Sequence, residues 1–339
     1  MTAQLPETWT DLRDTSRPIV GGYRLALLHS GANVRVFAAI QTGSGLPGVL
    51  LDLPTDAPGI ESCPLLCKAF NVTVAPFPGM APYRVGVLTM LGNPEYEDLF
   101  GLLAQEILDA TKSAKDPGQA VAAAKRVVER WRYFTERRRA PMTDERVRGL
   151  IGELLVLARL LRSGEATAIL RAWTGPSDGL HDFEMPSWSG EVKTFLADEG
   201  PTVRISDPRQ LEVVELRPVY LIPVKLARSS TAGKALPSII DIVSEQLHMT
   251  PGALDLFDLK LAAYGYLPAH SALYTDPYAC EQILTFAVRH GFPRIAFEDI
   301  PSAVMNVQYS LSLGALGSFA LSTESLLGSR ITALEPNAP

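Results

Sequence analysis

The sequence contains few cysteines and no long apolar segment. Its three cysteines, Cys63, Cys67 and Cys280, are an odd number and too few for a disulfide framework in 339 residues. Cys63 and Cys67 form a C-x₃-C pair, but a zinc site would need two more ligands nearby, so we interpret them as buried thiols. No apolar stretch approaches the length of a membrane span, and no secretory signal is found. These absences predict a cytoplasmic protein with no membrane partner.

Motifs of several enzyme classes are also missing. The five histidines are dispersed without the HxxxH type of spacing that metal ligands adopt, and no GxxxxGK[ST] phosphate-binding loop occurs. The apolar fraction of 47% and the charged fraction of 20% nevertheless predict a folded protein rather than a disordered or fibrous one.

Charge is distributed unevenly along the chain. The net charge of −6 argues at first against a nucleic-acid partner. Residues 125–148, however, carry nine basic and four acidic side chains, a net +5 that leaves −11 for the remainder. Salt confines the field of distant charges to about 8–10 Å, so this segment can still contact phosphates. Within it we predict Arg137, Arg138 and Arg139 as DNA contacts; a solvated helix face is the alternative interpretation.

One pattern near the middle of the chain indicates phosphodiester chemistry. Asp182 is followed nine residues later by Glu191 and then by Lys193. Glu191 and Lys193 alternate across one apolar residue and would share one face of a strand. Turn-forming residues at 186–190 predict a hairpin that folds the strand of Asp182 back towards Glu191. Two carboxylates can hold an octahedral Mg²⁺ ion, and the lysine then places a cation beside the attacking water.

Taken alone, this D-x₈-E-x-K pattern is weak, because alternating glutamate and lysine usually mark a solvated strand face. Glu153 strengthens it, since this acid lies in an apolar helical segment, 147–162, where an unpaired carboxylate is costly to bury. A metal, a lysine or a backbone amide would satisfy it, and Arg159 is a further structural alternative. Asp178 competes with Asp182 as the metal ligand, but we prefer Asp182 because it would lie in the paired strand.

Around these residues the chain resembles the PD-(D/E)XK nuclease superfamily, which has the restriction-endonuclease-like fold. The order helix–strand–turn–strand–helix–strand is that of this nuclease core. The narrower resemblance is to the bacterial family of PD-(D/E)XK motif proteins, inferred to be nucleases of restriction and phage defence. His181 replaces the proline of the motif, which weakens the match without removing it. The similarity runs in order over about residues 145–313 and rests on segments 149–154, 173–176, 182–183, 191–194, 206, 210–211, 292–295 and 307–311.

The resemblance implies roles for individual residues. Asp182 and Glu191 match the metal-binding acids, and Lys193 matches the lysine beside the attacking water. Glu153 matches the helix glutamate that completes the metal shell. Gln210 is a candidate DNA contact, with an ordinary helix-surface glutamine as the alternative. The implied cofactor is Mg²⁺, with Mn²⁺ as a substitute, and the implied substrate is DNA.

The expected fold class is α/β (α+β), with a mixed central sheet flanked by helices and a β-rich N-terminal region. Short apolar or alternating runs separated by Gly- and Pro-rich turns predict the N-terminal strands. The predicted organisation is a β-rich domain at 1–92, a helical and basic connecting region at 93–140, a nuclease-like core with a C-terminal extension at 141–320, and a tail at 321–339.

Three functions are compatible with these sequence features. The leading one is a metal-dependent DNA endonuclease of a bacterial restriction or phage-defence system. The second is a catalytically inactive subunit that keeps the nuclease fold for DNA binding or assembly, although the complete set of acids and lysine argues against it. Hydrolysis of another phosphate ester is the third, and the missing phosphate-binding loop disfavours it. Expected partners are DNA, a second copy of the chain in a homodimer, and other proteins of a restriction or defence operon.

Overall fold

The structure, a computed structural model, divides into two compact units, Met1–Arg139 and Ala140–Pro339. The residues it describes are 5–14, 18–31, 34–77, 81–137, 141–177, 179–212, 217–229, 231–329 and 334, without the side chains of 98, 136 and 137. The predicted boundary between residues 92 and 93 falls inside the first unit, and the four-part division of the chain stays a prediction.

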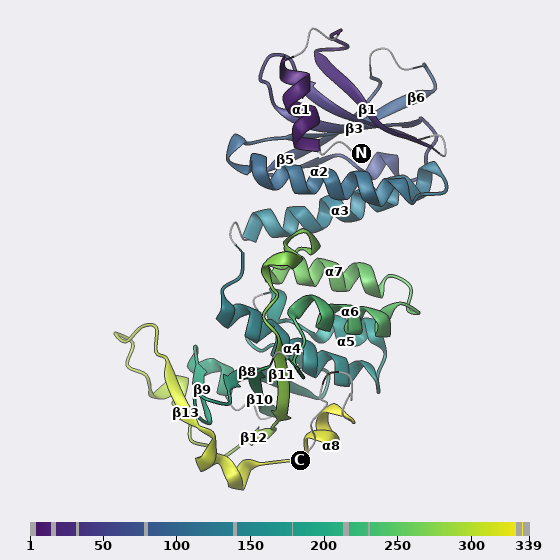
Figure 1. Cartoon of the computed structure of the whole chain (residues 1–339). Coiled ribbons are helices and arrows are strands. Elements are labelled where there is room, and N and C mark those ends of the chain that lie inside the picture. The colour runs from purple at the N-terminus through teal and green to yellow at the C-terminus, as the bar shows by residue number, and fades with distance from the viewer. Residues whose placement is uncertain are drawn as a thin grey trace. The chain divides into compact units, whose positions relative to one another are not determined.

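The first unit combines a sheet with helices. Its strands are β1 (Tyr23–Gly31), β2 (Val34–Gln41), β3 (Pro47–Pro54), β4 (Leu65–Leu66), β5 (Phe70–Ala75) and β6 (Arg84–Leu91). Its α-helices are α1 (Leu5–Asp14), α2 (Glu97–Lys112) and α3 (Pro117–Arg137). The strands form one antiparallel sheet in the order β1-β2-β3-β6-β5-β4. Helices α2 and α3 lie side by side against this sheet (Figure 1).

Strand alternation explains why the middle of this sheet is buried on both faces. Leu50 of β3 packs with Phe77 and Leu88 on one face. The next residue, Leu51, points to the other face, where it lines a cavity with Val87 and residues of α3. Such strands need a cover on each side, which explains their continuous apolar runs.

The second unit contains a mixed sheet. Its strands are β7 (Phe183–Met185), β8 (Trp188–Leu196), β9 (Thr202–Ile205), β10 (Val219–Arg228), β11 (Tyr278–Ile283), β12 (Phe286–Val288) and β13 (Tyr309–Ser312). Its α-helices are α4 (Asp144–Leu161), α5 (Ala166–Ala172), α6 (Leu236–Leu247), α7 (Ala253–Tyr264) and α8 (Thr323–Leu327). The sheet order is β11-β10-β8-β7, with β12 also pairing with β10; β8 and β10 are parallel and the other pairs antiparallel. Strands β9 and β13 form a separate two-stranded ribbon.

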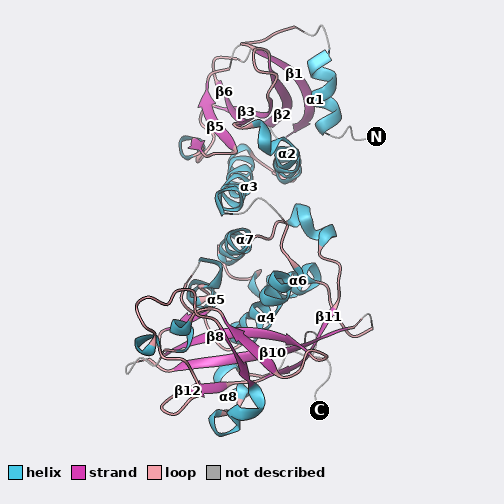
Figure 2. Ribbon diagram, turned by 90° about the vertical axis from the view of Figure 1, so that its left-hand side faces the viewer, coloured by secondary structure: helices cyan, strands magenta, loops and turns pink. Residues whose placement is uncertain are grey.

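Helices α4, α6 and α7 lie over one face of the mixed sheet (Figure 2). Helix α4 begins after Thr143, whose side chain accepts a hydrogen bond from the Arg146 N–H at 3.4 Å. The helix then packs closely on β8: a Cβ at Gly152 would lie 2.5 Å from Cγ2 of Thr194. This close approach holds the next residue, Glu153, beside the strand.

The predicted fold class, α+β with a β-rich N-terminal region, is confirmed. Within the described ranges no helix is both long and apolar enough to cross a membrane.

Candidate active site

A cleft of about 590 Å³ in the second unit gathers the predicted catalytic residues. Glu153 reaches it from α4, and Asp182 from the position just before β7. Glu191 and Lys193 reach it from β8. Three separate elements therefore bring the four side chains to one place.

A β-hairpin places Asp182 beside Glu191. Strands β7 and β8 pair with Phe183 opposite Gly190, as the turn residues predicted. Asp182 precedes β7, so the expectation that it lies within the strand is wrong by one residue. Its Oδ2 accepts a hydrogen bond from the Val192 N–H at 2.8 Å. This bond ties the carboxylate to the strand that carries Glu191.

Glu191 and Lys193 face the same side of β8, as side-chain alternation requires. Nζ of Lys193 lies 2.7 Å from Oε1 of Glu191. The other oxygen of Glu191, Oε2, is buried and has no hydrogen-bond partner among the described residues. A buried carboxylate oxygen without a donor is costly, so this atom indicates that the site takes a further ligand.

Two aromatic side chains hold Glu153. Nε1 of Trp173 donates a hydrogen bond to its Oε2 at 2.7 Å, and the Tyr264 hydroxyl bonds the same carboxylate. The sequence suggested instead a lysine, a backbone amide or Arg159 as protein partners. The buried indole N–H of Trp173 needs an acceptor, which is a signal that sequence reasoning can use. Tyr264 comes from α7, too far along the chain for any spacing rule to connect it with Glu153.

A glycine makes room for the acids. A Cβ at Gly175 would lie 2.5 Å from Oε2 of Glu153 and 2.9 Å from Oδ1 of Asp182. The two carboxylates therefore approach the same point of the backbone, which only a residue without a side chain permits. This close approach explains the Gly175 position in the 173–176 segment that resembles the nuclease family.

Burial raises the pKa of all three acids. The pKa of Glu191 rises to about 8, because burial and then the charge of Asp182 disfavour its ionised form. Burial also raises the pKa of Asp182. It raises that of Glu153 well above the usual value, and the charge of Asp182 adds to this rise. Burial opposes the Lys193 ammonium, but the neighbouring carboxylates of Glu191 and Asp182 raise the lysine pKa. The charge of this lysine thus acts on all three acids.

The donor set fits a hard divalent cation. Asp182, Glu191 and Glu153 offer the carboxylate oxygens that Mg²⁺ and Mn²⁺ prefer, and Oε2 of Glu191 is free to bind. In the described part of the chain, no three His, Cys, Asp or Glu side chains stand in an arrangement that could already hold an ion.

The structure supports none of the predicted DNA contacts directly. Gln210 lines the cleft, but its Oε1 accepts hydrogen bonds from the N–H groups of Ser206 and Asp207 at 3.2 and 3.3 Å. These bonds cap the short 3₁₀ helix η4 (Pro208–Leu211) and favour a structural role. The Arg137 side chain, Arg138 and Arg139 lie outside the described residues, and so does the competing metal ligand Asp178.

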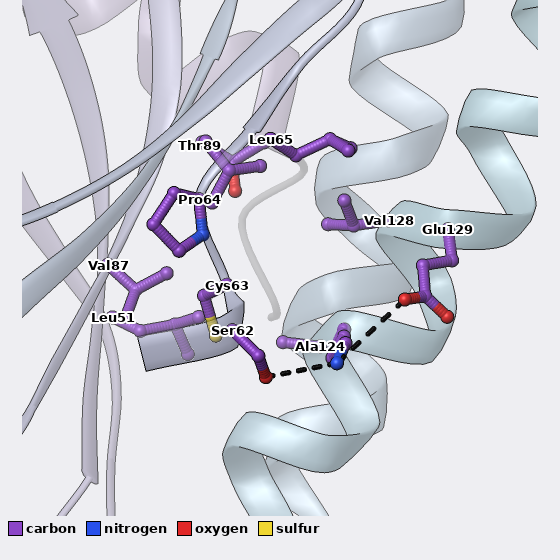
Figure 3. Close-up of a pocket in the computed structure, with 12 residues that line it drawn as sticks. Leu51, Ser62, Cys63, Pro64, Leu65, Val87, Thr89, Ala124, Val128 and Glu129 are labelled. Carbon is purple, nitrogen blue, oxygen red and sulfur yellow. Dashed lines mark hydrogen bonds and ion pairs between the residues drawn. The ribbon is translucent and has the colours of Figure 1, made fainter. Parts of the chain in front are cut away.

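The first unit has a separate small cavity, of about 40 Å³, between its sheet and α3 (Figure 3). This space is room for about three water molecules. None of the predicted site residues lines it. Cys63 does, and burial raises the pKa of its thiol, which opposes the thiolate that zinc binding needs. Cys63 therefore fits the interpretation of a buried thiol.

The chain was compared with known proteins. Residues 5–314 match the family described as "Putative PD-(D/E)XK family member, (DUF4420)". No curated protein and no solved structure gave a match. PD-(D/E)XK proteins are generally nucleases and typically use divalent metals. Because the match covers most of the chain, the resemblance inferred from the sequence is confirmed, and the chain belongs to this PD-(D/E)XK family.

Proposed function

We propose that this protein is a metal-dependent endonuclease that hydrolyses DNA phosphodiester bonds. The observation that carries the proposal is the meeting of Asp182, Glu191 and Lys193 in one cleft, with Glu153 held beside them. Acids buried together at raised pKa are typical of functional sites and are rarely kept for stability alone. Membership of a nuclease superfamily supports the same reaction class.

Asp182, Glu191 and Glu153 would hold Mg²⁺, with Mn²⁺ as a substitute. Because these acids are buried and repel one another, they gain more from a cation than solvated acids would. When bound, such an ion supplies positive charge that polarises the scissile phosphate and lowers the pKa of water.

Lys193 would contact the substrate directly. Its side chain is 19% exposed and its ammonium is kept charged by the acids around it. It can donate hydrogen bonds to phosphoryl oxygens on which negative charge develops, or orient the attacking water. Arg148 and Arg204 line the same cleft and offer positive charge to flanking phosphates.

The biological setting that we propose from the family resemblance is restriction or phage defence, with a second copy of the chain or other proteins of the same operon as partners. An inactive DNA-binding subunit remains the competing function. A cleavage assay on supercoiled plasmid distinguishes the endonuclease from the inactive subunit. We expect the wild-type protein to nick or linearise the plasmid with Mg²⁺ or Mn²⁺ and to leave it intact with EDTA. Methylated and unmethylated plasmid should both be tested.

The decisive variant is Lys193→Met, with Lys225→Met as its control. Lys225 lies on the neighbouring strand β10 and pairs with Glu281 at 2.8 Å, outside the residues that line the cleft. We expect Lys193→Met to cut about 10²–10³-fold more slowly, and Lys225→Met to stay within about twofold of wild type. Full activity of Lys193→Met would contradict the assignment of the site. DNA binding by the wild type without cutting in any metal would favour the inactive subunit.

A further inference from the structure

The segment between β12 and β13 exposes an unusual density of apolar side chains. Ile295, Phe297, Val304 and Met305 are 39%, 51%, 48% and 81% exposed. They are four of the twelve large apolar side chains that stand exposed in the described part of the chain, and they fall within eleven residues. Single exposed apolar residues need no explanation, but a cluster marks an interaction surface. We call residues 295–306 the apolar loop.

The apolar loop is held in shape by its own hydrogen bonds. The Val304 N–H donates to the Pro301 carbonyl at 2.8 Å and closes a turn. Asn306, with a φ of 57°, adopts the left-handed conformation that returns the chain to β13. The loop therefore presents Val304 and Met305 on a preorganised turn, and it projects beyond the β9–β13 ribbon (Figure 1). Preorganisation lowers the entropy lost on binding.

The loop is continuous with the candidate active site. A second hollow, of about 310 Å³, is lined by Phe297, Val304, Met305 and η4. Ser206 and Gln308 line both this hollow and the catalytic cleft.

The apolar loop is close enough to the cleft to contact a duplex bound along its Gln308 side. Met305 precedes Gln308 by three residues, so their Cα atoms are at most about 11 Å apart. The major groove alone is about 12 Å wide. A DNA duplex that lies along the Gln308 side of the cleft therefore comes within reach of Met305.

Apolar side chains gain little from phosphates, so contact with DNA here means contact with sugars and bases. Proteins that bind the minor groove use apolar side chains, such as Met, Leu, Ile and Phe, as wedges that unstack neighbouring base pairs. Arg209 stacks over Phe297 at 5.7 Å and pairs with Asp207 at 2.5 Å, which neutralises the base of the loop locally. Arg204 at the rim of the cleft can meet the adjacent phosphates.

From this placement we infer that the apolar loop is a DNA wedge: Val304 and Met305 enter the duplex next to the scissile phosphate and unstack the bases there. The inference rests on the proposed endonuclease function and adds a substrate-deforming site to it. A protein surface could also cover such a loop, and the test below includes that outcome.

The test compares Val304→Ser/Met305→Ser with Met249→Ser, each in an Asp182→Asn background that holds DNA uncut. Met249 follows α6 and is also 81% exposed, so it controls for the loss of an exposed methionine. Permanganate footprinting on a plasmid that the wild type cleaves reports unstacked thymines without knowledge of the recognition sequence. DNA affinity is measured in parallel by fluorescence anisotropy.

We expect the Asp182→Asn protein and its Met249→Ser form to make thymines near the cleavage site several-fold more reactive. In the double variant this reactivity should return to that of free DNA, and DNA affinity should fall about tenfold. If the double variant keeps the footprint and the affinity, the wedge is refuted while cleavage by the wild type still supports the nuclease. If no form binds or cuts DNA, both proposals fail. If the wild type self-associates in ultracentrifugation and the double variant does not, the loop is a protein interface and not a wedge.

Discussion

Both compact units bury carboxylates beside a sheet, and they neutralise them in opposite ways. In the first unit Asp52 is fully buried, and it accepts hydrogen bonds from Nε of Arg35 at 2.6 Å and from Nε of Arg84 at 2.5 Å. In the second unit, the charge of Lys193 acts on three buried acids, Glu153, Asp182 and Glu191. One carboxylate with two guanidinium groups is a closed structural network, because each oxygen has a charged donor.

In the second unit, Glu153, Asp182 and Glu191 are buried close together although their charges repel one another. Burial and mutual repulsion raise the pKa of the acids, and Oε2 of Glu191 keeps an unused lone pair among the described residues. The number of partners around a buried charge, and not its burial alone, therefore separates a structural charge from a candidate functional one.

Removing an arginine from the Asp52 network should have the largest effect on stability. Arg84→Met leaves buried Asp52 with Arg35, whose side chain is 44% exposed, and we expect the free energy of unfolding to fall by about 3–5 kcal/mol. The control is Arg13→Met, since Arg13 pairs at 2.6 Å with Glu97, which is also well exposed. That change should cost less than about 1 kcal/mol. Equal losses for the two variants in urea unfolding would show that Asp52 does not depend on its arginines.

Removing one charge from the cluster of Glu153, Asp182 and Glu191 should raise stability instead of lowering it. Glu191→Gln removes one of three crowded charges, and with EDTA present at pH 8 we expect it to raise Tm by about 5 °C. The folded pKa of Glu191 is raised to about 8, so the wild type loses stability as pH rises from the unfolded pKa towards 8. The advantage of the variant should therefore be small near pH 5, grow up to pH 8 and then level off. A constant difference across this range, measured by calorimetry, would contradict the raised pKa.

Loosening the aromatic support of Glu153 should change metal affinity. Tyr264→Phe removes one donor to the carboxylate, and such losses around a metal ligand typically weaken binding by about tenfold or more. We expect titration calorimetry to show weaker Mn²⁺ binding, with cutting restored at saturating metal. Tyr274→Phe is the control, because its hydroxyl accepts from the Met142 N–H at 3.1 Å, away from the acids. Equal metal affinity in Tyr264→Phe and wild type would mean that Glu153 does not contribute to the site.

The smallest expected effect on stability is that of replacing a buried threonine. Thr89 is buried as a residue and lines the cavity beside α3, which has room for water, and no hydrogen bond from its hydroxyl to a described residue is found (Figure 3). Water in this cavity can satisfy the hydroxyl, so Thr89→Val should change the free energy of unfolding by less than about 0.5 kcal/mol. Thr285→Val should lower stability by about 1 kcal/mol, because the buried Thr285 hydroxyl donates to that of Thr323 at 3.1 Å. Equal losses of stability for the two variants in denaturant unfolding would show that the Thr285–Thr323 hydrogen bond does not distinguish the two threonines.

Much of the candidate site could be predicted because its information is local. Strand alternation put Glu191 and Lys193 on one face, and turn residues predicted the hairpin that returns Asp182 to them. Glu153 was selected because a lone acid in an apolar helix needs a partner. Gln210 was harder, because the same glutamine can cap a turn or contact a ligand, and the sequence does not separate these uses.

The sequence by itself determined the strands of the N-terminal region, the helix and hairpin that carry the site, and the family of the chain, since these follow from periodicity and motif order along the chain. Only the tertiary structure decided that Tyr264 and Trp173 hold Glu153, that Gly175 lets two carboxylates meet, and that the apolar loop borders the cleft. These features depend on distances and desolvation between segments far apart in the chain, and no local spacing encodes them.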